Sequence, residues 1–253
     1  GRADELFRLI IALQPDDPTI GLAWSRFAMK RPDADSEVIF GALLEMYPTS
    51  PEVVLDWAAQ LDRQNRFTEA LRAMEGLGSD ELSKPAAALL VADLLYADNR
   101  FDDAMAALDR VDTESLENNP ARTASIDSRR TRYEEVAVKW ETELAIRETE
   151  ATLDDLPRVQ LITSRGPILL ELFEDHAPNT VANFMSLAES GYYDGTRFHR
   201  VLPKFMAQGG DPNSRDGASG QAGSGGPGYN IKDEHTLDDI RFHFAGSLSM
   251  AKT

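Results

Sequence analysis

The chain has 253 residues, which is enough for one large domain or two ordinary ones. It contains no cysteine, which excludes disulfides, thiolate zinc sites and thiol catalysis, and no apolar run approaches the ~20 residues of a membrane-spanning helix. Residues 157–253 carry 9 basic and 11 acidic residues, so residues 1–156 hold −15 of the net charge of −17. An acidic surface of this kind disfavours nucleic acid and anionic membranes as partners and favours basic or neutral ones.

Two segments of the first half repeat at an interval of 34 residues. "NRFTEALRAM" begins at Asn65, and "NRFDDAMAAL" begins at Asn99. The matched positions include phenylalanines, which would fill the space beside an inter-helix turn, and alanines, which would let paired helices approach closely. These pairs are Trp57 and Val91, Ala58 and Ala92, Leu61 and Leu95, Phe67 and Phe101, and Ala70 and Ala104. A 34-residue period with two amphipathic helices per unit is typical of tetratricopeptide repeats.

Residues 1–118 therefore resemble an all-α tetratricopeptide array, which implies a surface for a protein partner. We expect units at about 18–50, 51–84 and 85–118, preceded by the tail of another unit, with prolines marking the junctions. The first of these units matches poorly, because Ser36 stands where a packing alanine is expected. A generic array of helical hairpins is the alternative interpretation. In either case, stacking of neighbouring units supplies the core.

Residues 119–156 predict one long helix that caps the array and leads to the next domain. Tyr133, Val136, Trp140 and Leu144 recur at helical spacing, and the stem of Arg147 continues their stripe. We interpret Trp140 as a core residue rather than part of a ligand site.

The remaining sequence, residues 157–253, changes to the short periods of β-structure. Strands are expected at 158–163 and 168–173, joined by "SRGP" into a hairpin. "APNTVANFMSLAESG" predicts a helix with Pro178 in its first turn and Gly191 just past its end. Further strands are expected at about 197–202, 205–209, 229–233 and 246–251. Short strands, glycine-rich loops and one helix together suggest an antiparallel β-barrel.

Four segments of this half resemble the cyclophilin family of peptidyl-prolyl cis-trans isomerases: "APNTVANF", "FHRVLPKFMAQGGD", "GSGGPGY" and "GSLSMA". They follow one another in the family's order, and the second is the most specific. The resemblance implies a cyclophilin-like barrel with a helix, isomerase activity on proline-containing polypeptide clients, and neither a cofactor nor a metal. It covers a little over half of a family domain, so we expect an incomplete barrel and a chain that is a fragment of a longer protein.

The resemblance also assigns roles to individual residues. Arg200 matches the catalytic arginine, and Gln208 matches a glutamine that orients the arginine and bonds the substrate backbone. The substrate-binding positions are His199 at the pocket edge, Phe205 and Met206 on the apolar floor, Gly223 in the rim loop of residues 223–226, and Ala251 and Lys252 as contacts to the peptide. Lys252 replaces the asparagine that is usual in the family.

The chemistry of prolyl isomerisation suits this set of residues. Partial double-bond character gives the peptide bond a barrier of roughly 18–20 kcal/mol, yet no covalent bond needs to break. A catalyst must only favour the twisted amide, in which the proline nitrogen regains its lone pair. A guanidinium supplies fixed, permanently charged donors for that purpose. We therefore interpret His199 as a pocket-edge residue rather than a general base.

Two further questions stay open from the sequence. A non-catalytic scaffold module that holds proline peptides without turnover is the alternative function. The chain starts at "GRADELF", without a methionine or a signal-peptide pattern. We expect a cytoplasmic protein, and leave a periplasmic or exported location open because a targeting segment could lie upstream.

Overall fold

The computed structural model describes residues 2–14, 17–31, 34–112, 116, 119–235 and 240–251. The chain divides into two compact units, Gly1–Val136 and Ala137–Thr253. None of the described helices is both long enough and apolar enough to cross a membrane.

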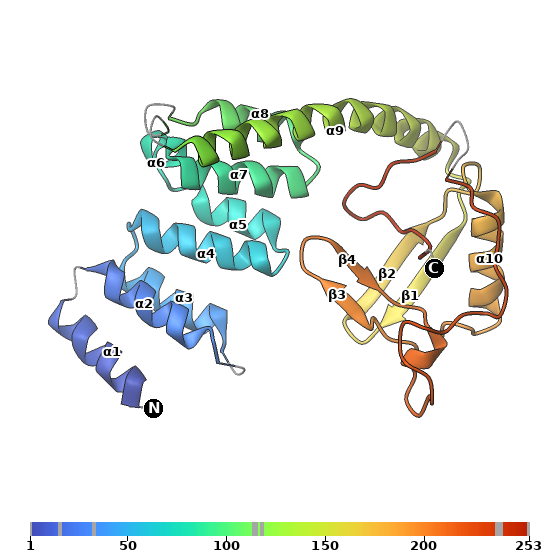
Figure 1. The fold of residues 1–253 in the computed structure, drawn as a ribbon, viewed down its shortest axis with the longest axis horizontal. Helices are drawn as coiled ribbons and strands as arrows, with labels where there is room; N and C mark the ends of the chain where they lie inside the picture. The colour runs from blue at the N-terminus through green and yellow to red at the C-terminus, as the bar shows by residue number, and fades with distance from the viewer. Residues whose placement is uncertain are drawn as a thin grey trace. The chain divides into compact units, whose positions relative to one another are not determined.

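Helices make up the described part of the first unit (Figure 1). They are α1 (Arg2–Leu13), α2 (Pro18–Ala28), α3 (Ser36–Met46), α4 (Pro51–Arg63), α5 (Phe67–Met74), α6 (Ser79–Ser83), α7 (Pro85–Ala97), α8 (Phe101–Asp109) and the first part of α9 (Pro120–Leu153). Proline begins α2, α4 and α7, where its missing N–H is not needed and its fixed φ already suits a helix.

The 34-residue period of the sequence is repeated in the structure. Helices α4 and α5 begin at Pro51 and Phe67, and α7 and α8 begin 34 residues later at Pro85 and Phe101. Within each pair the two helices pack against each other. The matched alanines are all buried: Ala58, Ala70, Ala92 and Ala104. The small side chains at the matched positions thus lie inside the packed helix array.

The turns inside the two pairs have the same geometry. Asn65 and Asn99 each have a φ of 60°, the left-handed conformation that ends many helices and that asparagine tolerates better than most residues. The next N–H reaches back five residues to a helix carbonyl oxygen, from Arg66 to Leu61 at 3.0 Å in the first pair. An equivalent bond of 2.9 Å closes the second pair. The repeated "NR" dipeptide is therefore a helix-ending signal.

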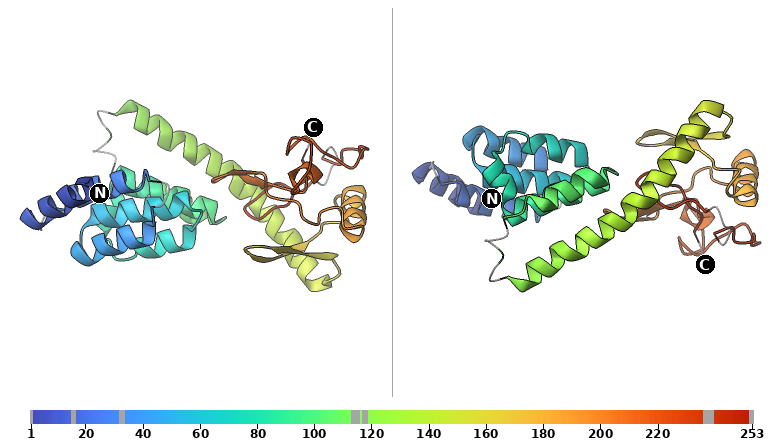
Figure 2. Two further views of the ribbon diagram at one scale, coloured as in Figure 1. Left: turned by 90° about the horizontal axis from the view of Figure 1, so that it is seen from below. Right: turned by 90° about the horizontal axis from the view of Figure 1, so that it is seen from above.

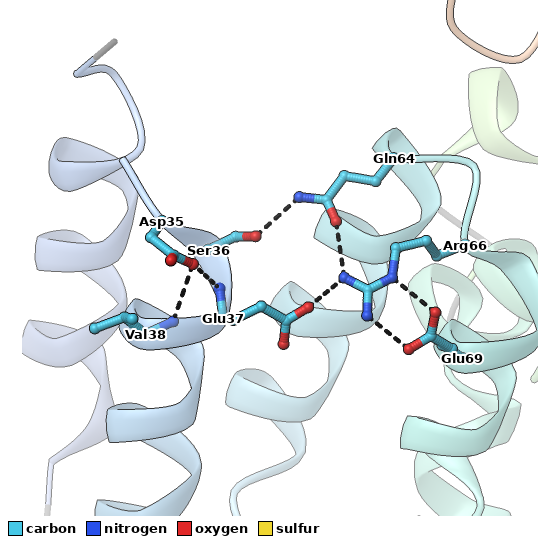
Figure 3. Close-up of polar contacts among 7 residues, drawn as sticks. All are labelled: Asp35, Ser36, Glu37, Val38, Gln64, Arg66 and Glu69. Atoms are coloured by element: carbon cyan, nitrogen blue, oxygen red, sulfur yellow. Dashed lines mark hydrogen bonds and ion pairs between the residues drawn. The ribbon is translucent and has the colours of Figure 1, made fainter. Parts of the chain in front are cut away.

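Ser36, which fits the repeat poorly, makes a polar contact instead of an apolar one (Figure 3). It is buried, and its hydroxyl oxygen accepts a hydrogen bond from Gln64 Nε2 at 2.8 Å. Arg66 then donates to Gln64 Oε1 at 3.1 Å and to both carboxylate oxygens of Glu69, at 2.8 and 2.6 Å. Arg66 also pairs with Glu37 on α3. Hydrogen bonds thus join α3 to the α4–α5 pair where alanine packing was expected.

Helix α9 is one continuous helix, as predicted (Figure 2). Tyr133 is fully buried and Trp140 is half-buried. Leu144, which shares the helical spacing of Tyr133 and Trp140, is 41% exposed, whereas the neighbouring Glu143 is buried. Glu143 turns inward because it pairs with Arg241 at 2.7 Å. An ion pair, rather than apolar spacing, therefore defines this face of the helix.

The second unit holds short strands and one further α-helix among its described residues. The elements after α9 are β1 (Arg158–Thr163), β2 (Gly166–Glu171), α10 (Pro178–Glu189), β3 (Arg200–Leu202), β4 (Met206–Gln208) and the 3₁₀ turn η2 (Pro212–Ser214). β1 pairs antiparallel with β2, and β3 pairs antiparallel with β4. Helix α10 packs on the first hairpin through Val181 and Phe184, which share a small buried cluster with Leu172 (Figure 1).

The expected hairpin and helix are confirmed, with corrections. The second strand spans 166–171 rather than 168–173. The strands expected at 229–233 and 246–251 are not formed: both segments lie in irregular structure. A strand exists only when another strand pairs with its backbone, and alternating apolar residues cannot supply that partner. The strands that are described form two separate two-stranded sheets rather than one curved sheet.

Candidate active site

The "FHRVLPKFMAQGGD" motif folds into the short β3–β4 hairpin. Pro203 and Lys204 form its turn, and the Phe205 N–H donates to the Leu202 carbonyl oxygen at 3.1 Å. Proline presets φ at the second turn position, and Lys204 has the φ of 61° that a type II turn needs at its third position. The turn therefore fixes which residues of the two strands lie opposite each other.

Two of the predicted catalytic residues are direct partners on this hairpin. Arg200 lies opposite Gln208, and Leu202 lies opposite Met206. Because side chains alternate along a strand, these four residues share one face of the hairpin. Arg200 is exposed, and its guanidinium makes no hydrogen bond or ion pair with any residue that the structure describes. The guanidinium is therefore available to donate hydrogen bonds to a ligand.

His199 joins the hairpin to the glycine-rich rim loop. Its backbone N–H donates to the Gln208 carbonyl oxygen at 3.0 Å, and its side chain is half-buried. A Cβ atom placed on Gly223 would lie 3.4 Å from His199 Nε2, so the loop runs directly against the imidazole. The structure thus brings His199, Gln208 and Gly223 together at one edge of the hairpin.

Two carboxylates of the second unit hold backbone N–H groups, one beside the predicted site and one at the start of α10. Asp211 is buried and accepts hydrogen bonds from the backbone N–H groups of Gly223 and Gly225. Glu234 accepts from the backbone N–H and hydroxyl of Thr180 at 2.9 and 2.7 Å, at the start of α10. Asp211 is the last residue of "GGD" and is followed by Pro212, and an aspartate before a proline is a local sequence signal for a capped turn. No local sequence feature indicates the role of Glu234, because its partner Thr180 lies 54 residues away.

The remaining predicted positions are less enclosed. Met206 is half-buried on the same face as Arg200, whereas Phe205 lies in the turn and is 78% exposed. Ala251 is exposed. Lys252 lies outside the described residues. The substrate-binding roles of these residues stay predictions.

Comparison with known proteins agrees with the motif. Residues 158–253 match the family model described as "Cyclophilin type peptidyl-prolyl cis-trans isomerase/CLD". Similar proteins include a peptidyl-prolyl cis-trans isomerase of Synechococcus elongatus, 50% identical over 91 residues, which are 36% of this chain and 56% of the relative. Peptidyl-prolyl cis-trans isomerase B of Bacillus subtilis is 48% identical over 91 residues, 36% of this chain and 58% of the relative.

A mammalian relative gives the same picture. Peptidyl-prolyl cis-trans isomerase-like 1 of Mus musculus is 47% identical over 95 residues, 38% of this chain and 54% of the relative. The chain thus spans about half the length of each of these three curated relatives. No solved structure matched the chain. Residues 158–253 thus match a cyclophilin-type peptidyl-prolyl cis-trans isomerase domain, both by the family model and by similarity to these relatives.

Proposed function

We propose that the protein accelerates cis–trans isomerisation of Xaa-Pro bonds in polypeptide clients. The observation that carries this proposal is the pairing of Arg200 with Gln208 on one hairpin face, with the guanidinium exposed and unpaired among the described residues. The names of the similar proteins support the same reaction for the family segment.

In the proposed reaction Arg200 acts on the twisted amide. As the Xaa-Pro bond rotates, conjugation is lost and the proline nitrogen gains a lone pair that a guanidinium N–H can donate to. This hydrogen bond forms in the transition state and not in the planar ground state, so it lowers the barrier instead of only strengthening binding. Gln208, directly across the hairpin, would hold the substrate backbone and orient the guanidinium.

The other site residues would hold the proline. Phe205 and Met206 would contact the pyrrolidine ring, His199 and Gly223 would border it, and Ala251 would contact the peptide backbone. An apolar surface suits a proline ring, which carries no N–H and needs no polar partner. We assign these residues to a cyclophilin-like β-barrel domain over residues 157–253.

For the helical half we propose a tetratricopeptide-like array that binds a protein partner. The array would cover residues 1–118, and the helix of residues 119–156 would cap it and lead to the isomerase domain. The 34-residue recurrence of the helix pairs supports this assignment. The −15 charge of residues 1–156 favours a basic or neutral partner over an acidic one.

A scaffold that binds proline peptides without turnover is the second candidate, because the exposed ring of Phe205 could contact a proline peptide whether or not the bond is isomerised. One experiment separates the two functions: NMR exchange spectroscopy on an Xaa-Pro peptide with catalytic amounts of the protein. An isomerase gives cis–trans exchange peaks that grow with protein concentration. Peptide shift changes without exchange peaks would establish the scaffold and reject the enzyme.

A further inference from the structure

A buried carboxylate binds two backbone N–H groups of the rim loop, residues 223–226. Asp211 is 7% exposed. Its Oδ1 atom accepts the Asn213 N–H at 2.6 Å, and its Oδ2 atom accepts the Gly225 N–H at 3.0 Å together with the Gly223 N–H. The two loop donors lie 12 and 14 residues along the chain. Asp211 therefore ties the loop backbone to the end of the β3–β4 motif, and Asn213 adds a side-chain hydrogen bond of 3.3 Å from its Nδ2 to Ser224 Oγ.

The charge state of Asp211 suits this task. Burial raises the pKa of a carboxyl group, but backbone N–H donors from Gly225, Asn213 and Gly223 outweigh it and leave the pKa of Asp211 below its ordinary value. The nearby His199 lowers the pKa further. The side chain is consequently ionised at neutral pH, where it accepts stronger hydrogen bonds than a neutral group would.

The rim loop packs closely against this carboxylate at Gly225 but not at Gly226. A Cβ atom on Gly225 would overlap Asp211 Oδ1 and lie 2.9 Å from Asn213 Nδ2. A Cβ atom on Gly226 would meet nothing within 4 Å. Gly223 has a φ of 96°, and the position that a Cβ atom would occupy on it faces His199 Nε2. The anchor therefore sets the distance between the loop and the imidazole beside Arg200.

We propose that Asp211 is a positioning residue that fixes Gly223 and Gly225 beside His199 and so sets the edge of the peptide site. Asp211 has no direct part in the chemistry, because its oxygens are occupied by loop and turn N–H groups. Its effect on the substrate passes through the loop. The expected effect on isomerisation kinetics rests on the proposed isomerase function, whereas the expected effect on the rim loop does not.

Asp211→Asn tests the anchor, because asparagine keeps the shape but has one acceptor oxygen and turns an NH₂ group toward an N–H donor. Amide hydrogen exchange at Gly223 and Gly225 should become at least tenfold faster. In the isomerisation assay, KM should rise at least threefold while kcat stays within twofold. A residue that only supports the fold would lower the melting temperature without this split between KM and kcat.

Gly225→Ala and Gly226→Ala are a matched pair that needs no change at Asp211. Gly225→Ala should push the carboxylate away and reproduce the fast exchange and raised KM, whereas Gly226→Ala should leave amide exchange at Gly223 and Gly225 at the parent rate, because its added Cβ meets nothing within 4 Å. The double variant Asp211→Asn/Gly225→Ala should be no worse than either single variant. Gly225→Ala also serves as the test if Asp211→Asn fails to fold by circular dichroism.

The amide-exchange and kinetic measurements test separate claims. Unchanged amide exchange at Gly223 and Gly225 in both variants would refute the anchor, whatever the activity. Faster exchange with unchanged KM would refute the positioning role. A parent protein without isomerase activity would refute the proposed function, and the exchange measurement would still decide whether Asp211 holds the loop.

Discussion

Arg200 and Phe205 contribute differently to the proposed reaction. The phenyl ring of Phe205 would contact the proline ring equally well in the planar and twisted states, so it would provide uniform binding. The guanidinium of Arg200 would favour only the twisted state. The 78% exposure of Phe205 leaves most of its ring surface available to a ligand.

Phe205→Ala should therefore raise KM roughly tenfold with little change in kcat, since burying part of an aromatic ring stabilises by about 1.5 kcal/mol. Steady-state isomerisation kinetics on an Xaa-Pro peptide measure both constants. Val201→Ala is the control, because Val201 is also exposed but lies on the hairpin face opposite the one that carries Arg200 and Gln208. A fall in kcat with unchanged KM would show that Phe205 acts in the transition state instead.

At the scale of elements, α10 depends on a distant residue for its start. Ala177 at the N-cap has no side-chain acceptor, so the first N–H groups of the helix need another partner. Glu234 takes the N–H groups of Asn179 and Thr180 at 3.1 and 2.9 Å. Burial would raise the pKa of Glu234, but hydrogen bonds from Thr180 and Asn179 lower it to about 2.

This contact should make the stability of α10 depend on pH. The pKa is depressed in the folded state, so the stabilisation is complete above the ordinary value of 4.5 and is lost as the pH falls towards 2. Glu234→Gln should lower the melting temperature at pH 7, and the gap from the parent should close between pH 4.5 and 2. Glu189→Gln, at the exposed end of α10, is the control. A gap that stays constant over this range would contradict the account.

The elements that could be predicted from sequence are those whose signals are local. Buried alanines at a 34-residue spacing and Pro178 at a helix start are visible in neighbouring residues, and both were confirmed. The arginine opposite the glutamine follows from a short turn. Glu234 could not be assigned, because its partners on α10 lie 54 and 55 residues away in sequence. Asp211 has a local Asp-Pro turn signal, but its contacts to the rim loop, 12 and 14 residues along the chain, have none. The helical spacing of apolar residues did not reveal that Glu143 is buried on α9, because its partner Arg241 lies almost a hundred residues later.

At the scale of the whole molecule, each unit has its own buried clusters. The apolar cluster of the second unit is small, and buried ion pairs supplement it. The Arg241 side chain is 7% exposed and contacts Glu143 at 2.7 Å and Glu150 at 2.5 Å. Its guanidinium also lies over the Phe173 ring at 3.7 Å.

Glu143→Ala should destabilise the second unit by about 3 kcal/mol, because it leaves a buried guanidinium short of one partner. Differential scanning calorimetry should show the transition of this unit moving to lower temperature while that of the first unit stays in place. Glu141→Ala is the matched control, two positions away on the exposed side of α9. Equal shifts for the two variants would mean that the buried ion pair adds nothing.

The most direct test of the account is the isomerisation rate of the Arg200→Ala variant, measured with a coupled assay on an Xaa-Pro peptide. If Arg200 supplies transition-state hydrogen bonds, kcat/KM should fall by about 10²–10³, the usual effect of removing one preorganised donor. Arg200→Lys should recover little, since an ammonium lacks the planar fork of donors. Peptide binding by NMR should weaken much less than the rate. An Arg200→Ala variant that isomerises the peptide within about threefold of the parent, well short of that donor effect, would contradict the proposed mechanism.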